Sequence, residues 1–114
     1  MENSRKETMQ KVLEIVAQET NTSVRDIVSK GRQRPIADAR KIFCNVMRSH
    51  QETTYSLKEV GAFINRDHPT TLFSCRAAEN VSKTDKRFAN ALNRVRNRVF
   101  NTSPSEVYNN VPQL

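Results

Sequence analysis

Apolar residues recur every three or four positions along most of the chain, which is the spacing of one face of an α-helix. Three segments, at about residues 6–19, 36–49 and 84–100, carry the clearest apolar stripes. The stripes consist of Met9, Val12, Leu13 and Val16; of Ala39, Ile42, Phe43, Val46 and Met47; and of Phe88, Leu92, Val95 and Val99. The chain has only two glycines, so few positions suit the turns of β-hairpins. We therefore predict an all-α fold of about six helices and no sheet.

A short helix and a basic loop are predicted between the first two stripes. Ser23 can cap a helix, and Asp26, three residues on, completes a box-like helix start. The helical pattern then breaks over Lys30–Pro35, where a glycine and a proline bracket the loop. This loop carries three cations, namely Lys30, Arg32 and Arg34.

The middle of the chain has the layout of a helix-turn-helix. Ser56 and Glu59 form a capping box, which predicts a short helix over Leu57–Phe63. A tight connection of about three residues follows, over 64–66. The next helix is expected to begin at Asp67–Pro69, because proline suits a first helical turn, where its missing N–H is not needed. Two short helices joined by such a turn are typical of a helix-turn-helix.

Size and composition favour one thinly cored domain. The chain has 114 residues, of which 36% are hydrophobic, and its mean hydropathy is −0.72. We expect one domain over residues 1–100, followed by a tail at 101–114 that is rich in proline and polar residues. No apolar run approaches the roughly 20 residues of a membrane helix, and the N-terminus lacks the apolar region of a secretory signal. We therefore expect a cytoplasmic protein on the nucleoid, or in the host cytoplasm if a phage encodes it.

Positive charge is concentrated in two blocks. The net charge is +7; residues 30–50 carry +5, residues 66–100 carry +5, and each of the three remaining segments carries −1. A surface that is basic only for solubility would not be divided in this way, so the pattern favours a face that binds a polyanion. A merely basic surface remains the alternative interpretation.

The two cysteines indicate neither a disulfide scaffold nor a metal site. Both lie within apolar helical patterns, so we interpret them as buried thiols. A zinc site would have to combine Cys44, His50, His68 and Cys75. Structural zinc sites usually draw their ligands in close sequence pairs, and these residues contain none, so no metal is predicted.

Catalysis has no support in the sequence. Asp67 and His68 are adjacent, so on a helix their side chains diverge by about 100° and do not form an orienting pair. No serine or cysteine sits in a glycine-flanked nucleophile elbow, and there is no glycine-rich loop to hold a nucleotide phosphate. We predict that the protein is not an enzyme and uses no cofactor.

The start of the helix after the turn has the chemistry of a DNA-reading helix. Asp67 can accept a hydrogen bond from a cytosine amino group, and His68 can bond a base or pack on a thymine methyl, while Arg66 holds a phosphate. Leu72 and Cys75 would face the core. The residues left nearer the DNA are Pro69, Thr70, Phe73 and Arg76. The alternative is that Asp67 only caps the helix and His68 is exposed without a role.

Two stretches resemble the DNA-binding C-terminal domain of the bacterial replication initiator DnaA. That family carries the pattern "L-x-E-I-G…G-R-D-H-T-T-V-L-x-A-C", and this chain has Leu57-Lys-Glu-Val-Gly61, Arg66-Asp-His-Pro-Thr-Thr-Leu72 and Ser74-Cys-Arg76. Upstream, the family's "D-L-L-S-K-x-R-x-R-x-I-x-x-A-R-Q-I" is matched by Asp26–Lys30, Arg32, Arg34, Ile36 and Ala39–Ile42. The likeness covers about residues 9–80.

The resemblance implies a role for each matched residue. Arg34 falls where an arginine enters the minor groove, and Arg40 and Lys41 fall at backbone-contacting positions. Leu57 and Lys58 lie near a phosphate, and Asp67 and His68 match the major-groove readers with Thr70 beside them. The complete predicted DNA-binding set is Lys30, Arg32, Arg34, Arg40, Lys41, Leu57, Lys58, Arg66, Asp67, His68, Pro69, Thr70 and Arg76.

Three departures from the family pattern matter. Ile64-Asn65 replaces a Gly-Gly, which predicts a different turn, and Pro69 replaces a threonine, which removes a donor. The sequence also lacks the family's ATPase and helicase-recruiting domains, so we expect a protein that binds a site but has no motor to open an origin. Residues 6–80 would form the family-like core and 84–100 an additional helix.

The predicted function is sequence-specific binding of double-stranded DNA at DnaA-box-like sites, in replication initiation or its regulation. A competing interpretation is that the helix-turn-helix docks a replication protein or a virion component, with Arg87–Arg98 as the docking surface. The sequence is also compatible with a transcriptional regulator, and with self-association through residues 84–114.

Overall fold

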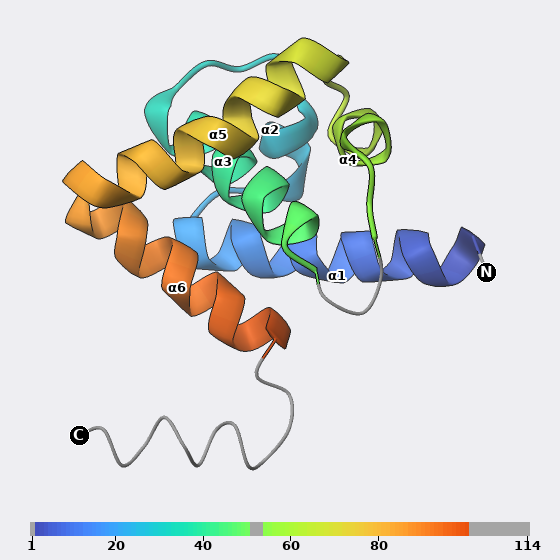
Figure 1. Cartoon of the computed structure of the whole chain (residues 1–114), viewed down its shortest axis with the longest axis horizontal. Coiled ribbons are helices and arrows are strands. Elements are labelled where there is room, and N and C mark those ends of the chain that lie inside the picture. The colour runs from blue at the N-terminus through green and yellow to red at the C-terminus, as the bar shows by residue number, and fades with distance from the viewer. Residues whose placement is uncertain (1, 51–53, 101–114) are drawn as a thin grey trace.

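The computed structural model describes residues 2–50 and 54–100, and within these ranges the chain is all-helical (Figure 1). The helices are α1 (Glu2–Thr20), α2 (Val24–Val28), α3 (Arg34–Arg48), α4 (Leu57–Phe63), α5 (His68–Thr84) and α6 (Lys86–Phe100). The predicted fold class is confirmed, with α4 and α5 as the helix-turn-helix. The predicted tail at 101–114 lies outside the described residues.

Helix α3 forms the centre of the core and contacts each of the other helices. Its apolar stripe, including Ile42, Phe43 and Met47, is fully buried. Residues from α1, α4 and α6 close around it, namely Leu13, Val16, Val60, Leu92 and Val95. The three stripes predicted from the sequence therefore all face this core. Helix α5 crosses in front of α3 in Figure 1, and α1 and α6 lie below it.

Three helix boundaries differ from the prediction. Helix α1 begins at Glu2 rather than near residue 6, and α3 begins at Arg34 rather than 36. Pro35 thus lies in the first turn of α3, where its missing N–H costs nothing. Helix α6 begins at Lys86 rather than 84 because Asp85 separates it from α5. The N–H of Asp85 donates to the Val81 carbonyl (2.8 Å), and its Oδ1 accepts from the Phe88 N–H (3.1 Å).

The turn between α4 and α5 forms without the family's Gly-Gly pair. Asn65 has φ 64°, a left-handed conformation that asparagine tolerates better than most residues. Gly61 allows the two helices to approach closely, since a Cβ there would meet the side chain of Thr71 and lie 2.8 Å from the Arg66 carbonyl oxygen. The Arg66 N–H closes the turn by donating to the Gly61 carbonyl (2.7 Å).

Candidate nucleic-acid interface

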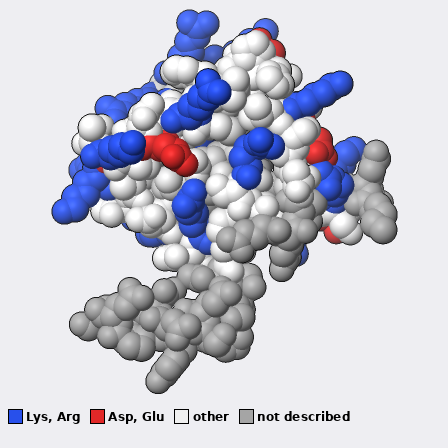
Figure 2. Space-filling model, in the orientation of Figure 1, with Lys and Arg blue, Asp and Glu red and all other residues white. Residues whose placement is uncertain are grey.

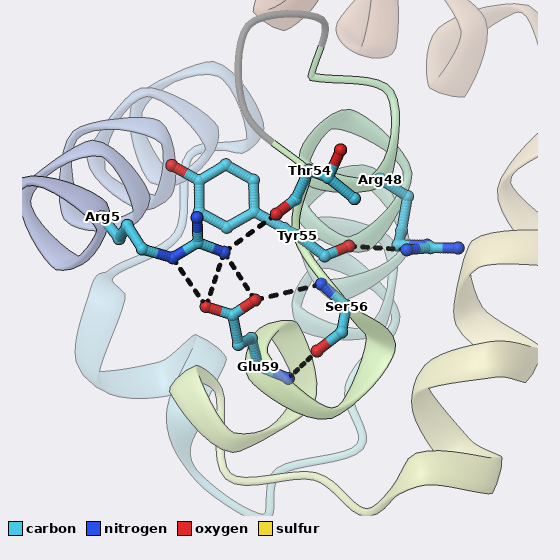
Figure 3. Close-up of polar contacts among 6 residues, drawn as sticks. All are labelled: Arg5, Arg48, Thr54, Tyr55, Ser56 and Glu59. Atoms are coloured by element: carbon cyan, nitrogen blue, oxygen red, sulfur yellow. Dashed lines mark hydrogen bonds and ion pairs between the residues drawn. The ribbon is translucent and has the colours of Figure 1, made fainter. Parts of the chain in front are cut away.

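A network of polar contacts anchors α4, the first helix of the helix-turn-helix, to α1 (Figure 3). The guanidinium of Arg5 donates to both carboxylate oxygens of Glu59 at 2.7–2.9 Å and to the Thr54 carbonyl at 2.9 Å. It also lies 4.6 Å from the ring centroid of Tyr55, which is buried. Ser56 and Glu59 form the predicted capping box. Glu59 therefore takes part both in the cap of α4 and in the ion pair with Arg5.

Arg5 and Glu59 each stabilise the charged form of the other. The hydrogen bond from Arg5 lowers the pKa of Glu59, and the backbone N–H of Ser56 lowers it further. Glu59 in turn raises the pKa of Arg5. On the other side of the same segment, Arg48 donates to the Tyr55 carbonyl at 2.6 Å (Figure 3). The segment entering α4 is therefore tied to both α1 and α3.

Arg40 organises the loop that precedes α3. Only 8% of this residue is exposed, and its guanidinium donates to four backbone carbonyls. The acceptors are Ile27 (2.7 Å), Gly31 (2.6 Å), Ser29 (2.6 Å) and Asp26 (3.2 Å). Burial lowers the pKa of Arg40, and the nearby charge of Arg66 adds to this. Arg40 was predicted to contact the DNA backbone, but four of its five N–H groups are used within the protein.

Arg66 joins the turn of the helix-turn-helix to the same loop. Its guanidinium donates to the carbonyl of Ser29, which Arg40 also contacts, and to the Asn65 carbonyl at 2.9 Å. A cavity of about 320 Å³ opens beside these contacts, which we call the basic hollow. It is lined by Lys30, Gly31, Arg32, Arg40, Arg66 and Thr70. Four cations and no carboxylate line it, so it suits an anion.

Arg34 lies apart from the basic hollow. As the first residue of α3 it points to the α5–α6 junction, where its Nη2 is 2.5 Å from Asp85 Oδ2. Its Nε lies 3.6 Å from Asp38 Oδ2, one turn along α3. It lines a different groove, which also contains the carboxylate of Glu19. The sequence placed Arg34 in the loop with Lys30 and Arg32, and the structure separates it from them.

The tip of α5 adjoins the basic hollow through Thr70. Asp67 caps the helix, since its Oδ1 accepts from the Thr70 N–H at 2.9 Å. The pKa of Asp67 is lowered by its hydrogen bonds with Thr70, and the charges of Arg66 and His68 lower it further. Asp67, His68, Pro69 and Thr70 are all exposed. The predicted capping role is thus present, and the Asp67 side chain remains exposed.

The exposed face of α5 has the orientation that the sequence predicts. Pro69, Thr70, Phe73 and Arg76 are exposed, whereas Leu72 and Cys75 are half-buried. Thr71 and Ala78 are buried on the opposite side of the helix. Of the other predicted site residues, Lys58 is exposed and Lys41 and Leu57 are half-buried.

A family model described as the bacterial DnaA protein helix-turn-helix matches residues 9–77. The chain belongs to the bacterial DnaA helix-turn-helix family. The chromosomal replication initiator protein DnaA of Crocosphaera subtropica is 35% identical over 89 residues, which are 77% of this chain and 19% of that protein. The DnaA of Nostoc punctiforme is 32% identical over 96 residues (83% and 20%), and that of Wolbachia pipientis is 34% identical over 95 residues (82% and 20%).

The chain spans about a fifth of the length of these relatives. It is thus a DnaA-like helix-turn-helix DNA-binding domain. The family model's match ends at residue 77, whereas the matches with the Nostoc and Wolbachia proteins cover 83% and 82% of the chain and therefore extend into α6. Helix α6 is tied to the rest of the domain, since Arg94 and Arg98 both pair with Glu19 of α1 (2.8 and 3.1 Å).

Lys and Arg side chains are spread over the face of this DnaA-like domain on which α5 and α6 lie, with few acidic side chains between them (Figure 2). Among the described residues, no three His, Cys, Asp or Glu side chains gather as metal ligands. The two thiols instead lie together, and the hydrogen bond with Cys75 and burial raise the pKa of Cys44. None of the described helices has the length and apolar character needed to cross a membrane.

Proposed function

We propose that this protein binds double-stranded DNA sequence-specifically at DnaA-box-like sites, in replication initiation or its regulation. The observation that carries the proposal is the basic hollow beside the exposed tip of α5, because it sets an anion site directly next to groups that can read bases. A major groove is about 12 Å wide and admits one helix, while its walls are phosphates. Such a protein would act in the cytoplasm, on the nucleoid.

In this proposal the tip of α5 enters the major groove. Asp67, His68 and Thr70 supply the polar base contacts, and all three are exposed. Lys58 on α4 and Arg76 on α5 are exposed for phosphates. Lys30 and Arg66 would hold the phosphates nearest the turn, at the basic hollow. Arg40 would stabilise this surface indirectly, because it holds the loop before α3 in place through the Ser29 and Gly31 carbonyls.

Arg32 is the residue that we propose for minor-groove insertion, in place of Arg34. Arg32 is exposed, lines the basic hollow and lies on the loop next to the tip of α5. Arg34 would first have to leave Asp85 and Asp38. An inserted arginine gains most where the minor groove is narrow, as in A·T-rich flanks. Arg32 should therefore favour sites with such a flank.

The test begins with selection from random duplexes, which should yield one preferred site that binds less tightly as salt rises. The affinities of Arg32→Ala and Arg34→Ala are then compared on that site. Arg32→Ala should reduce the salt slope by about 1 and lose most affinity on A·T-rich flanks. Arg34→Ala is the matched control and should bind nearly as the wild type does. Equal losses of affinity in both variants would contradict the assignment of Arg32. A wild-type affinity that does not change with salt concentration would contradict the proposed DNA binding.

The protein-docking alternative receives less support from the geometry. It needs the arginines of α6 as a free surface, but Arg94 and Arg98 are paired with Glu19. Arg96 donates to Asn45 Oδ1 at 2.7 Å, so it ties α6 to α3. These side chains hold α6 on the domain.

A further inference from the structure

Phe73 is the one large apolar side chain that is strongly exposed among the described residues with placed side chains (4–50 and 54–100). Its exposed fraction is 66%, although other phenylalanines of the domain, such as Phe43 and Phe88, are buried. Phe73 lies in the middle of a helix whose opposite side is held in the core by Thr71 and Ala78. Its exposure therefore follows from the packing of α5 and not from a loose chain end.

The position of Phe73 on α5 relates it to the proposed base-reading groups. Pro69 precedes it by four residues and Arg76 follows by three, so all three lie on one face of the helix. Pro69 and Phe73 are separated by about 6 Å along the helix axis, close to two base-pair steps of about 3.4 Å. Together they form an apolar strip, which begins at the tip of α5 and continues into the helix.

We propose that Phe73, with Pro69 beside it, forms a binding site for the 5-methyl group of a pyrimidine in the major groove. The inference rests on the proposed DNA binding and adds the chemical group that is read. Thymine is the only one of the four bases that displays a methyl group in this groove, and a phenylalanine can pack on it. 5-Methylcytosine displays the same methyl group, so the strip would also distinguish methylated from unmethylated cytosine.

The strip has no polar means of reading a base. Pro69 has no N–H, and its ring presents only carbon atoms. Phe73 can likewise offer only apolar surface to a base edge. Covering this surface with a methyl group removes apolar area from water, whereas the bare edge of uracil or cytosine leaves that area wet. The contribution of one methyl group corresponds to a change in affinity of about fourfold.

The experiment uses the full chain and the preferred duplex found by selection. Each thymine of the site is replaced in turn by deoxyuridine, which removes only the methyl group. At one or two positions the wild type should bind about fourfold more weakly to the uridine duplex. At the same positions, a duplex with 5-methylcytosine should bind more tightly than the one with cytosine by a similar factor.

Variants of Phe73 assign the effect to the strip. Phe73→Ala should bind the thymine and uridine duplexes equally at the position read by the ring, and Phe73→Leu should keep most of the discrimination. Glu79→Gln is the matched control, because Glu79 is exposed on the same helix but about 120° around it from Phe73. It should behave as the wild type. Circular dichroism of each variant checks that the helices are retained.

Two results would overturn the inference while leaving DNA binding intact. One is wild-type affinity that no single thymine-to-uridine replacement changes. The other is discrimination that persists unchanged in Phe73→Ala, which would assign the methyl group to another residue. If the wild type binds no duplex at all, the proposed function fails first, and the exposed Phe73 would then serve a protein contact.

Discussion

Replacing Arg40 by alanine tests whether this residue supports the protein or touches the DNA. The buried guanidinium donates to four carbonyl oxygens at the end of α2 and in the loop after it. Only the bond to Ile27 is fully buried, and the other three are partly open to water. In Arg40→Ala the Ile27 carbonyl would lose its partner, while water could replace the rest.

The expected loss of stability follows from these contacts. A buried acceptor left without a partner costs about 1–3 kcal/mol, and each charged hydrogen bond that water replaces costs a fraction of its usual 1.5–3 kcal/mol. The free energy of unfolding should therefore fall by about 3–5 kcal/mol, out of roughly 5–15 for a whole domain. At about 4–8 °C per kcal/mol, the Tm should fall by at least about 12 °C. Arg40→Lys should give an intermediate value, because a lysine cannot present the planar fork of donors.

Urea unfolding followed by circular dichroism measures this change. Lys41→Ala is the matched control, since the neighbouring residue is half-buried and was predicted to contact phosphate. It should leave the free energy of unfolding within about 0.5 kcal/mol of the wild type and weaken DNA binding at low salt. The reasoning would be refuted if Arg40→Ala unfolds as the wild type does while its salt slope for DNA binding falls by about 1. Arg40 would then be a phosphate contact.

Two further predictions concern the positioning of the helix-turn-helix. Gly61→Ala should lower the free energy of unfolding by about 1–3 kcal/mol, because the added Cβ meets Thr71. Ala62→Ser is the control, since residue 62 is exposed, and it should leave the free energy of unfolding nearly unchanged in the same urea titration. Arg5 lowers the pKa of Glu59 below its ordinary 4.5. The Arg5–Glu59 ion pair therefore stabilises the fold fully above pH 4.5 and loses its effect as the pH falls through the lowered pKa. Glu59→Gln should therefore flatten part of the acid-side decline of Tm with pH, and an acid limb identical to the wild type would contradict this.

The sequence predicted the structural features that depend on residues close together in the chain. The stripe of α3 placed a whole helix face in the core, since hydrophobic burial follows local periodicity. The capping box of Ser56 and Glu59 located the start of α4, and both of its hydrogen bonds are present. Asp67 and the proline after it similarly located the start of α5. Such signals reveal helices and their ends without any knowledge of tertiary contacts.

The contacts that position the site were not predictable in the same way. Arg40 lies off the apolar stripe of α3, which normally indicates a solvated cation, yet it is buried against carbonyls that precede it by 9–14 positions. Arg34 and Asp85 are 51 positions apart, so no local pattern links them. Backbone carbonyls carry no signature in the sequence, and a cation that binds them therefore looks like one that binds DNA.

The basic loop uses its positive charges in two different ways. The Ser29 carbonyl accepts hydrogen bonds from both Arg40 and Arg66, and these bonds join the end of α2, the middle of α3 and the turn of the helix-turn-helix at one point. Two arginines are thereby fixed close together, which is tolerable because carbonyl oxygens surround their guanidinium groups. Lys30 and Arg32 remain exposed beside them. An anion that enters the basic hollow meets the charges of all four residues, so the contacts that build the loop also prepare it for a phosphate.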